Sequence, residues 1–167
     1  MSNSVIDPIV RADLRRLVES EELGASMFGT AERLATDDIQ RRAWNALHEL
    51  EIRTNAGVGA FLERAGLEIA HANSLASAVG TAGAVGLRVL PYGFQLRAVR
   101  EGTARYLPAF HRLAAHYADT PESAFFDYVL RHELSIIEFS SNALAQAPGA
   151  LDPVLRLLDS KVPGVMG

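Results

Sequence analysis

The chain has 167 residues, of which 49% are hydrophobic and 22% charged, and its formal net charge is −4. That length suits one domain with a substantial core, and the acidic balance, with no cluster of Lys and Arg among aromatics, argues against a nucleic-acid-binding surface. The sequence has no cysteine, which excludes disulfides, thiolate nucleophiles and cysteine-ligated zinc.

The N-terminal residues show no basic stretch followed by an apolar run, so no secretory signal is predicted. Residues 72–87 carry no charge, but this stretch is too short and too rich in Gly, Ala and Ser to span a bilayer. We therefore expect a cytoplasmic protein without a membrane or nucleic-acid partner.

Two helices are predicted in the first half of the chain. The first opens at Asp7, a good N-cap, with Pro8 in the first helical position, and extends to about residue 35. The second begins at about Asp38, after the acidic sequence TDD, and ends near Gly66. Apolar residues recur in both at the spacing of one helix face.

A long connection, residues 67–93, follows and has room for a short helix of small residues. A third helix is predicted from about Phe94 to Tyr117, kinked at Pro108, and a fourth from Pro121 to about Ala145. Residues 151–159 can add a short last helix. No segment alternates apolar and polar residues in the way that predicts a β-strand.

These elements predict an all-α fold: a single domain over residues 1–167, with a four-helix bundle over about 8–146 and a short helix and tail over 150–167. The only long connection joins helices two and three.

Acidic residues interrupt the apolar face of each predicted helix, as in the stretch NALHELEIRTNAGV around Glu51. The corresponding residues of the other helices are Glu22, Glu101 and Glu133. Because each has apolar neighbours one turn away, all four are predicted to point into the bundle. Glu19 competes with Glu22 for this role.

This arrangement resembles the ferritin-like superfamily, which includes the rubrerythrin-type and bacterioferritin-type di-iron carboxylate bundles. The resemblance covers about residues 8–146 and is most specific in EELGASMF (21–28) and LHELEIRT (47–54). It implies a four-helix bundle with a long crossover, in which helices one and three each supply a Glu and helices two and four each supply Glu-x-x-His.

The sequence departs from that family pattern at both histidines, since Thr54 and Ile136 stand in their places. Neither is a good ligand for ferrous iron. His48 shares a helix face with Glu51, whereas His132 is adjacent to Glu133 in sequence and therefore lies about 100° round the helix from it. An intact di-iron centre is therefore not the first expectation.

Without a metal ion, four glutamates in a dry interior repel one another unless some are protonated, paired or open to a pocket. Carboxylates with separated pKa values are typical of acid–base catalysis. The alternative is that these glutamates are hydrogen-bonded core residues of a degenerate bundle. His48 is a catalytic candidate for the same reason as Glu51, and equally a structural histidine.

Other residues have weaker assignments. Tyr92, Phe94 and Tyr106, with the kink at Pro108, can line an opening beside Glu101, together with Thr54 and Ile136, although ordinary packing explains them as well. The glycine-rich GTAGAVG (80–86) lacks the strand and the Lys-Ser/Thr of a phosphate loop. Its small residues instead permit close approach of a helix or of a second subunit, and a homodimer is compatible with that.

Three functions remain open. The first is a cofactor-free enzyme whose interior carboxylates isomerise, cyclise or eliminate a small, mostly apolar substrate. The second is an oxidoreductase that binds iron or manganese through Glu22, Glu51, Glu101 and Glu133. The third is a bundle that binds a ligand or partner without catalysis. The loss of both family histidines favours the first.

Overall fold

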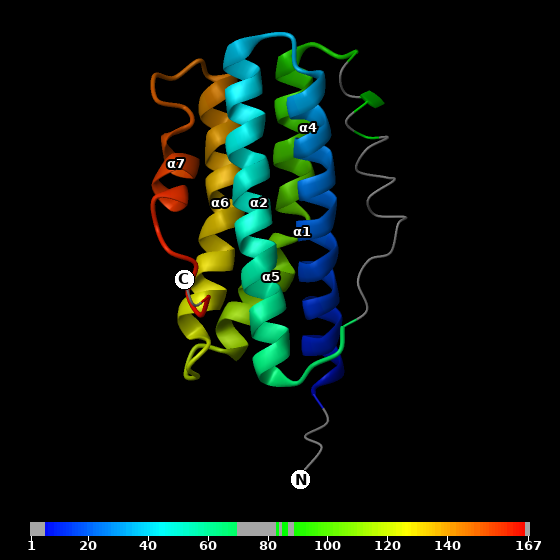
Figure 1. The fold of residues 1–167 in the computed structure, drawn as a ribbon, viewed down its shortest axis with the longest axis vertical. Coiled ribbons are helices and arrows are strands. Elements are labelled where there is room, and N and C mark those ends of the chain that lie inside the picture. The colour runs from blue at the N-terminus through cyan, green and yellow to red at the C-terminus, as the bar shows by residue number, and fades with distance from the viewer. Residues whose placement is uncertain (1–5, 70–82, 84, 87–88, 166–167) are drawn as a thin grey trace.

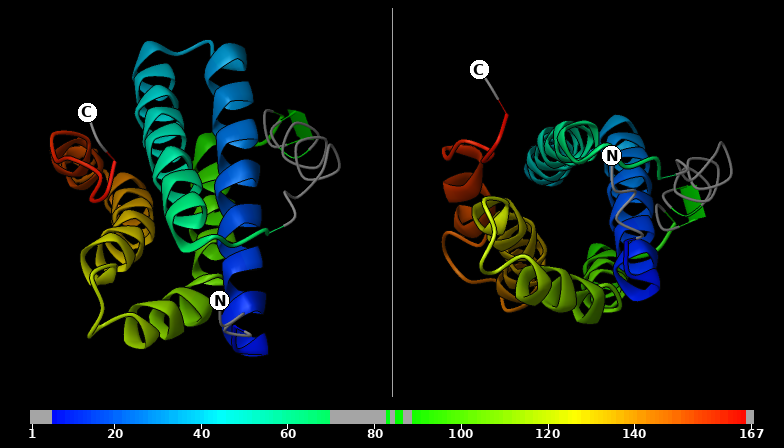
Figure 2. Two further views of the ribbon diagram at one scale, coloured as in Figure 1. Left: turned by 60° about the horizontal axis from the view of Figure 1, so that its bottom comes forward. Right: turned by 90° about the horizontal axis from the view of Figure 1, so that it is seen from below.

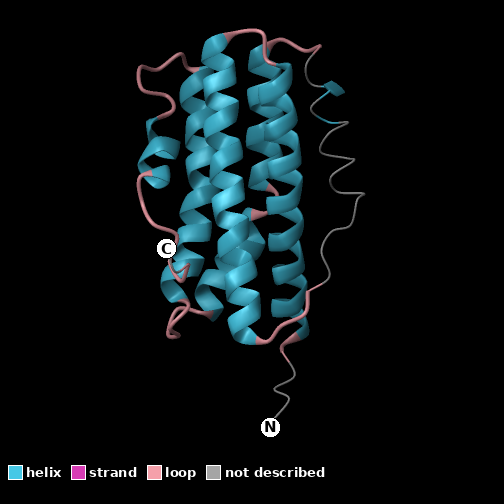
Figure 3. Cartoon of the chain, viewed as in Figure 1, coloured by secondary structure: helices cyan, strands magenta, loops and turns pink. Residues whose placement is uncertain are grey.

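The computed structural model describes residues 6–69, 83, 85–86 and 89–165. Over these residues the chain is all α-helical, without a β-strand (Figure 3). Most of the predicted long connection between the second and third helices, including the short helix expected there, lies outside the described residues.

Two long helices form the first half. Helix α1 spans Pro8–Leu34, and the Asp7 carboxylate accepts a hydrogen bond from the backbone N–H of Ile9 at 2.7 Å. Helix α2 spans Asp38–Ala65 and is capped by Asp37, which accepts a bond from the Gln40 N–H at 2.9 Å. It ends at Gly66, whose φ of 63° lies in the left-handed region that glycine adopts without steric cost. The predicted boundaries of both helices are confirmed to within one or two residues.

The third predicted helix is two helices. Helix α4 spans Tyr92–Ala104 and α5 spans Leu107–His116, so the chain breaks at Arg105 and Tyr106 instead of kinking at Pro108. Pro108 sits in the first turn of α5, where its missing N–H is not needed. The proline therefore starts a helix here, because it cannot continue the previous one.

Helices α6, Ser123–Leu144, and α7, Asp152–Leu158, complete the chain. Helix α1 lies against α2 and α5, while α6 lies against α2, α4, α5 and α7 (Figure 1). Seen along the long axis, α7 is on the outside of the group formed by α1, α2, α6 and the α4–α5 pair (Figure 2).

The core consists of two hydrophobic clusters at different heights. One contains Leu17, Phe61, Phe110 and Val129, and the other contains Phe28, Leu47, Leu96 and Ile136. Within α1, α2 and α6, buried acidic residues and a histidine stand between the members of these two clusters. Two apolar clusters separated by a polar layer therefore position the site.

Candidate functional site

The polar layer consists of Glu21 on α1, Glu51 on α2, and His132 and Glu133 on α6. Their side chains are almost fully buried: Glu21 and His132 are 0% exposed, and Glu51 and Glu133 are 4% exposed. Burial of four ionisable groups in one layer is costly unless they are paired, protonated or bound to an ion. The layer therefore calls for an explanation beyond packing.

His132 stands between two of these carboxylates. Its Nδ1 lies 3.6 Å from Oε1 of Glu21, and its Nε2 lies 3.5 Å from Oε1 of Glu51. One donor atom each from Glu21, His132 and Glu133 falls within 4.8 Å of the other two. Residues from three helices thus converge on one point.

These contacts do not satisfy the buried polar atoms. Neither nitrogen of His132 and neither carboxylate oxygen of Glu21 makes a hydrogen bond of good geometry to any residue that the structure describes. Such orphaned buried atoms are rare in folded proteins and are found at redox, catalytic or ion-binding sites.

Elsewhere the chain does satisfy a buried carboxylate. Asp13 on α1 is only 1% exposed, and it accepts hydrogen bonds from Arg16 at 2.8 Å and from two nitrogens of Arg112 on α5 at 2.8 and 2.7 Å. The Arg112 side chain holds the pKa of Asp13 below its ordinary value. The contrast with Glu21, two turns further along the same helix, marks the polar layer as a distinct kind of site.

The absence of a side chain at Gly24 makes room for Glu51. A Cβ at position 24 would lie 2.5 Å from both Cδ and Oε1 of Glu51, too close for any real contact. Thr54, one turn after Glu51, is buried but donates its hydroxyl to the Leu50 carbonyl oxygen at 2.9 Å. The hydroxyl is therefore used within α2.

Burial and mutual repulsion hold protons on the acidic groups. Burial, and then the charges of Glu51 and Glu133, raise the pKa of Glu21 well above its ordinary value. Burial also raises the pKa of Glu133 to about 8, against the opposing effect of His132. At neutral pH the Glu133 carboxyl is therefore protonated in the folded protein, and the Glu21 carboxyl holds its proton more strongly than an ordinary glutamate does.

The pKa of His132 is raised as well. Burial lowers it, but the charge of the Glu51 carboxylate, its close approach to the ring at 3.5 Å and the charge of Glu133 together outweigh burial. The charge of Glu51 thus favours the protonated form of the buried imidazole.

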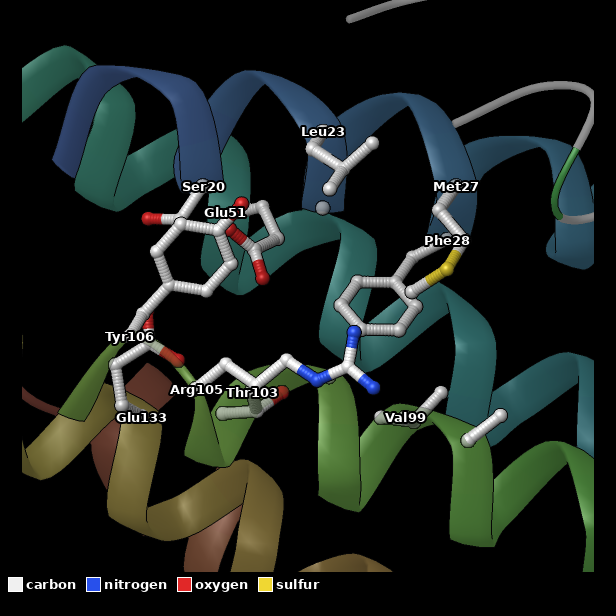
Figure 4. A pocket seen from close by; sticks show the side chains of 13 residues that line it. Ser20, Leu23, Met27, Phe28, Glu51, Val99, Thr103, Arg105, Tyr106 and Glu133 are labelled. Atoms are coloured by element: carbon white, nitrogen blue, oxygen red, sulfur yellow. The ribbon is translucent and has the colours of Figure 1, made fainter. Parts of the chain in front are cut away.

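A pocket of about 280 Å³ adjoins the polar layer (Figure 4). Glu51 and Glu133 reach its wall, next to Ser20 and Tyr106, and the remainder of the wall is largely apolar and comes from α1 and α4. The break between α4 and α5 lies at this pocket, because Arg105 and Tyr106 both line it. Two of the buried acids are therefore accessible to a small molecule.

The prediction of four inward glutamates is wrong at two positions. Glu22 is only partly buried, because the inward stripe of α1 passes through Leu17, Glu21 and Phe28, and Glu22 is one residue further round. Glu101 is exposed, since the buried face of α4 contains Leu96 and Val99. Glu51 and Glu133 do lie inside, but α4 contributes no carboxylate to the polar layer.

His48 and two of the predicted pocket residues also lie elsewhere. The Nδ1 of His48 is 3.1 Å from Oε2 of Glu32, and the half-exposed pair ties α2 to α1. Tyr92 packs edge-on against Trp44, and Phe94 is 53% exposed. These three residues do not line the pocket, so their predicted roles there are wrong.

Of the other residues predicted to line the pocket, one does so and two do not. Tyr106 lines the pocket. Ile136 is buried in the core cluster that contains Phe28, and neither it nor Thr54 reaches the pocket wall. The small residues Gly83 and Gly86 are exposed, with open space where a Cβ would stand.

Sequence reasoning missed two central residues, Glu21 and His132. The signal for Glu21 was present: Leu14, Leu17, Gly24 and Phe28 recur at steps of three and four, and position 21 falls on that stripe. The signal for His132 was present as well: Phe125, Val129, Ile136 and Phe139 recur at steps that place position 132 on their stripe. Glu133, one residue further on, is also buried, because several helices pack against α6.

Three carboxylates and an imidazole are donors that suit iron or manganese. The residues that would hold an ion are Glu21, His132 and Glu133, with Glu51 next to them, and not the predicted set that included Glu22 and Glu101. The three donors of Glu21, His132 and Glu133 suit one ion, and Glu51 faces the other ring nitrogen of His132, whereas the two-metal bundles use four carboxylates and two imidazoles. The orphaned atoms of Glu21 and His132 fit such an ion; when bound, it would supply Lewis-acid or redox chemistry.

Comparison of the chain with protein-family models, with curated proteins and with solved structures finds no significant match. Among the helices that the structure describes, none is both long and apolar enough to cross a membrane.

Proposed function

We propose that this chain is an enzyme that carries out acid–base chemistry on a small, mostly apolar molecule, using Glu51 and Glu133 at the wall of the pocket. Isomerisation, cyclisation and elimination are the reactions that such a pair performs. The observation that carries the proposal is that two buried carboxyl groups from different helices, α2 and α6, reach one largely apolar cavity.

Glu133 and Glu51 have different surroundings, and we assign them different roles. Glu133, with a pKa of about 8, holds a proton at neutral pH and serves as the donor. Glu51 faces the imidazole of His132 at 3.5 Å and serves as the acceptor. One acid that holds its proton and a second carboxyl beside an imidazole divide the roles of donor and acceptor.

The proton balance of an isomerisation follows from these roles. Glu51 removes a proton from one carbon, and Glu133 delivers a proton to another, so the substrate keeps its composition. We assign the return of the proton from Glu51 to Glu133 to His132, whose Nε2 lies 3.5 Å from Glu51 and which has a ring nitrogen within 4.8 Å of a Glu133 oxygen. General acid–base catalysis of this kind contributes about 10²–10⁴-fold to a rate.

The proposal is tested by hydrogen exchange into bound compounds. A panel of small apolar molecules is incubated with the protein in D₂O, and deuterium at carbon is measured by mass spectrometry. We expect incorporation that falls about 10²-fold or more in Glu51→Gln and Glu133→Gln. The matched control is Glu22→Gln, on the same layer of α1 but only partly buried, which should exchange like the parent.

Equal exchange in Glu51→Gln and in the parent would contradict the proposal. So would higher stability of both Gln variants with no effect on any ligand, a result that favours a non-catalytic bundle.

A second function, a metal-dependent oxidoreductase, is favoured by one observation: the donor atoms of Glu21, His132 and Glu133 lie within 4.8 Å of one another, and those of Glu21 and His132 make no hydrogen bond to any described residue. The resemblance to the ferritin-like superfamily belongs to this proposal. Metal analysis of protein produced in medium supplemented with iron and manganese separates the two functions. About one ion per chain, lost in His132→Ala, would favour the oxidoreductase; metal below stoichiometry would favour the cofactor-free enzyme.

A further inference from the structure

Among the described residues that line the pocket, Arg105 is the one cationic side chain. It follows the last residue of α4, at the break that separates α4 from α5, and it is exposed at the pocket's edge. In Figure 4 its guanidinium group points along the pocket toward Phe28 and Val99, and away from Glu133. The pocket therefore has a positive end and an acidic end.

The wall between these ends is apolar. Leu23, Met27 and Phe28 of α1 face Val99 of α4 across the space (Figure 4), and Ala98 of α4 also lines it. A volume of about 280 Å³ lies at the lower end of the range of ligand pockets, roughly 300–1,000 Å³. The space accommodates a short chain or a single ring, and nothing much larger.

We infer that the ligand of this pocket is a small apolar carboxylic acid, bound with its carboxylate at Arg105 and its hydrocarbon body between α1 and α4. This inference rests on the proposed function only for the choice of the pocket. A guanidinium group binds a carboxylate through two parallel hydrogen bonds, which fixes orientation as well as charge. That orientation directs the carbon end of the molecule toward Glu51 and Glu133, where the proton chemistry takes place.

A positively charged ligand fits this pocket less well than an acid does. A cationic amine can pair with Glu51 or Glu133, but it would then place its charged group where the carbon must react and leave its apolar end at Arg105. A neutral molecule gains nothing from Arg105. The separation of charges along the pocket thus selects the acid over its amide and over an amine of the same shape.

The fluorescence of Trp44 provides a measure of ligand binding in the pocket. Trp44 is the single tryptophan, and its ring stacks on Phe28, with ring centroids 6.0 Å apart. Because Phe28 lines the pocket, a bound molecule is expected to change the fluorescence of Trp44. Cyclohexaneacetate, cyclohexaneacetamide and 2-cyclohexylethylamine are suitable probes, since they share one apolar body and do not absorb in the tryptophan region.

We expect cyclohexaneacetate to bind about tenfold more tightly than the amide, with the amine the weakest. In Arg105→Gln the acid should bind no better than the amide, whereas Arg105→Lys should retain a preference for the acid. The matched control is Arg97→Gln, because Arg97 is an exposed residue of the same helix that lies over Phe94, outside the pocket. It should bind all three probes like the parent.

The inference would be overturned if the amine bound most tightly, if acid and amide bound equally, or if no probe bound. It would also be overturned if Arg105→Gln still preferred the acid. The outcome is separable from that of the proposed function. Probe selectivity is measured without turnover and should persist in Glu133→Gln, whereas deuterium incorporation depends on Glu51 and Glu133 whichever probe binds best.

Discussion

Replacing Gly24 by alanine tests whether the polar layer depends on the exact position of Glu51. The new Cβ would stand 2.5 Å from Cδ and Oε1 of Glu51 and 2.8 Å from Oε2. Ordinary carbon contacts begin at about 3.5 Å, so the carboxylate must move by about 1 Å. The carboxylate is the end of a flexible side chain and lines the pocket beside Gly24, so it can move into that space and away from its present position.

Two effects on stability oppose each other. Overpacking of a buried site costs about 1–3 kcal/mol, and replacement of a helical glycine by alanine contributes about 0.5–1 kcal/mol in the other direction. We therefore expect a net loss of up to about 2 kcal/mol in the free energy of unfolding. The larger consequence falls on His132, whose Nε2 lies 3.5 Å from Oε1 of Glu51.

Because the charge of Glu51 is the main influence that raises the pKa of His132 against burial, its displacement should lower that pKa. Nuclear magnetic resonance titration of His132 in metal-free protein measures the change, and urea denaturation measures stability. The matched control is Gly59→Ala on α2, where an added Cβ meets nothing within 4 Å. It should gain stability by about 0.5–1 kcal/mol and leave His132 unchanged.

The double variant Gly24→Ala with Glu51→Asp should recover stability, because the shorter side chain withdraws from the new Cβ. An unchanged His132 pKa in Gly24→Ala, together with a gain in stability equal to that of Gly59→Ala, would refute the reasoning.

Three further predictions concern buried acids. The pKa of Glu133 is about 8 in the folded chain against an ordinary 4.5, so the folded chain binds more protons than the unfolded chain between these values and should lose stability as pH rises through that window. In urea denaturation at pH 5–8, Glu133→Gln should flatten this decline by up to about 1.4 kcal/mol per pH unit. Equal pH dependence of stability in parent and variant would contradict the assignment. Glu21→Met removes a buried carboxyl that makes no hydrogen bond to the described residues, and it should raise the free energy of unfolding by about 1–3 kcal/mol. The partly buried Glu22→Met should not raise it, and the reverse order would place Glu22 inside. Asp13→Asn should cost about 1.5–3 kcal/mol at neutral pH. Since the pKa of Asp13 is lowered, its contribution is present above the ordinary value of 3.8 and lost as pH falls through the folded-state pKa, so parent and variant should converge in acid.

The helices could be predicted because their signals are local. Asp7 and Pro8 at the start of α1 and Gly66 at the end of α2 act through backbone geometry and nearest hydrogen bonds, which need no tertiary context. The proline at position 108 was equally visible, but whether it bends one helix or separates two depends on what packs at the break. There Arg105 and Tyr106 line a pocket instead of continuing a helical face.

The candidate site was predictable only in part. Glu51 and Glu133 each stand on a single apolar stripe, which periodicity identifies. Glu21 and Glu22 are neighbours, and a choice between them requires the direction from which α2 and α5 approach α1. A step of one residue turns a side chain by about 100°, enough to exchange an interior acid for a surface one.

By itself, then, the sequence determined an all-helical chain, the approximate bounds of its helices and the presence of acids on two inward faces, because helix propensity, capping and periodicity are properties of short segments. Tertiary structure alone decided that His132 lies between Glu21 and Glu51, that α4 brings no carboxylate, and that Gly24 makes room for Glu51 beside a pocket. The reason is that burial, pairing and proton affinity depend on which helix faces meet, and residues far apart in the chain set those meetings together.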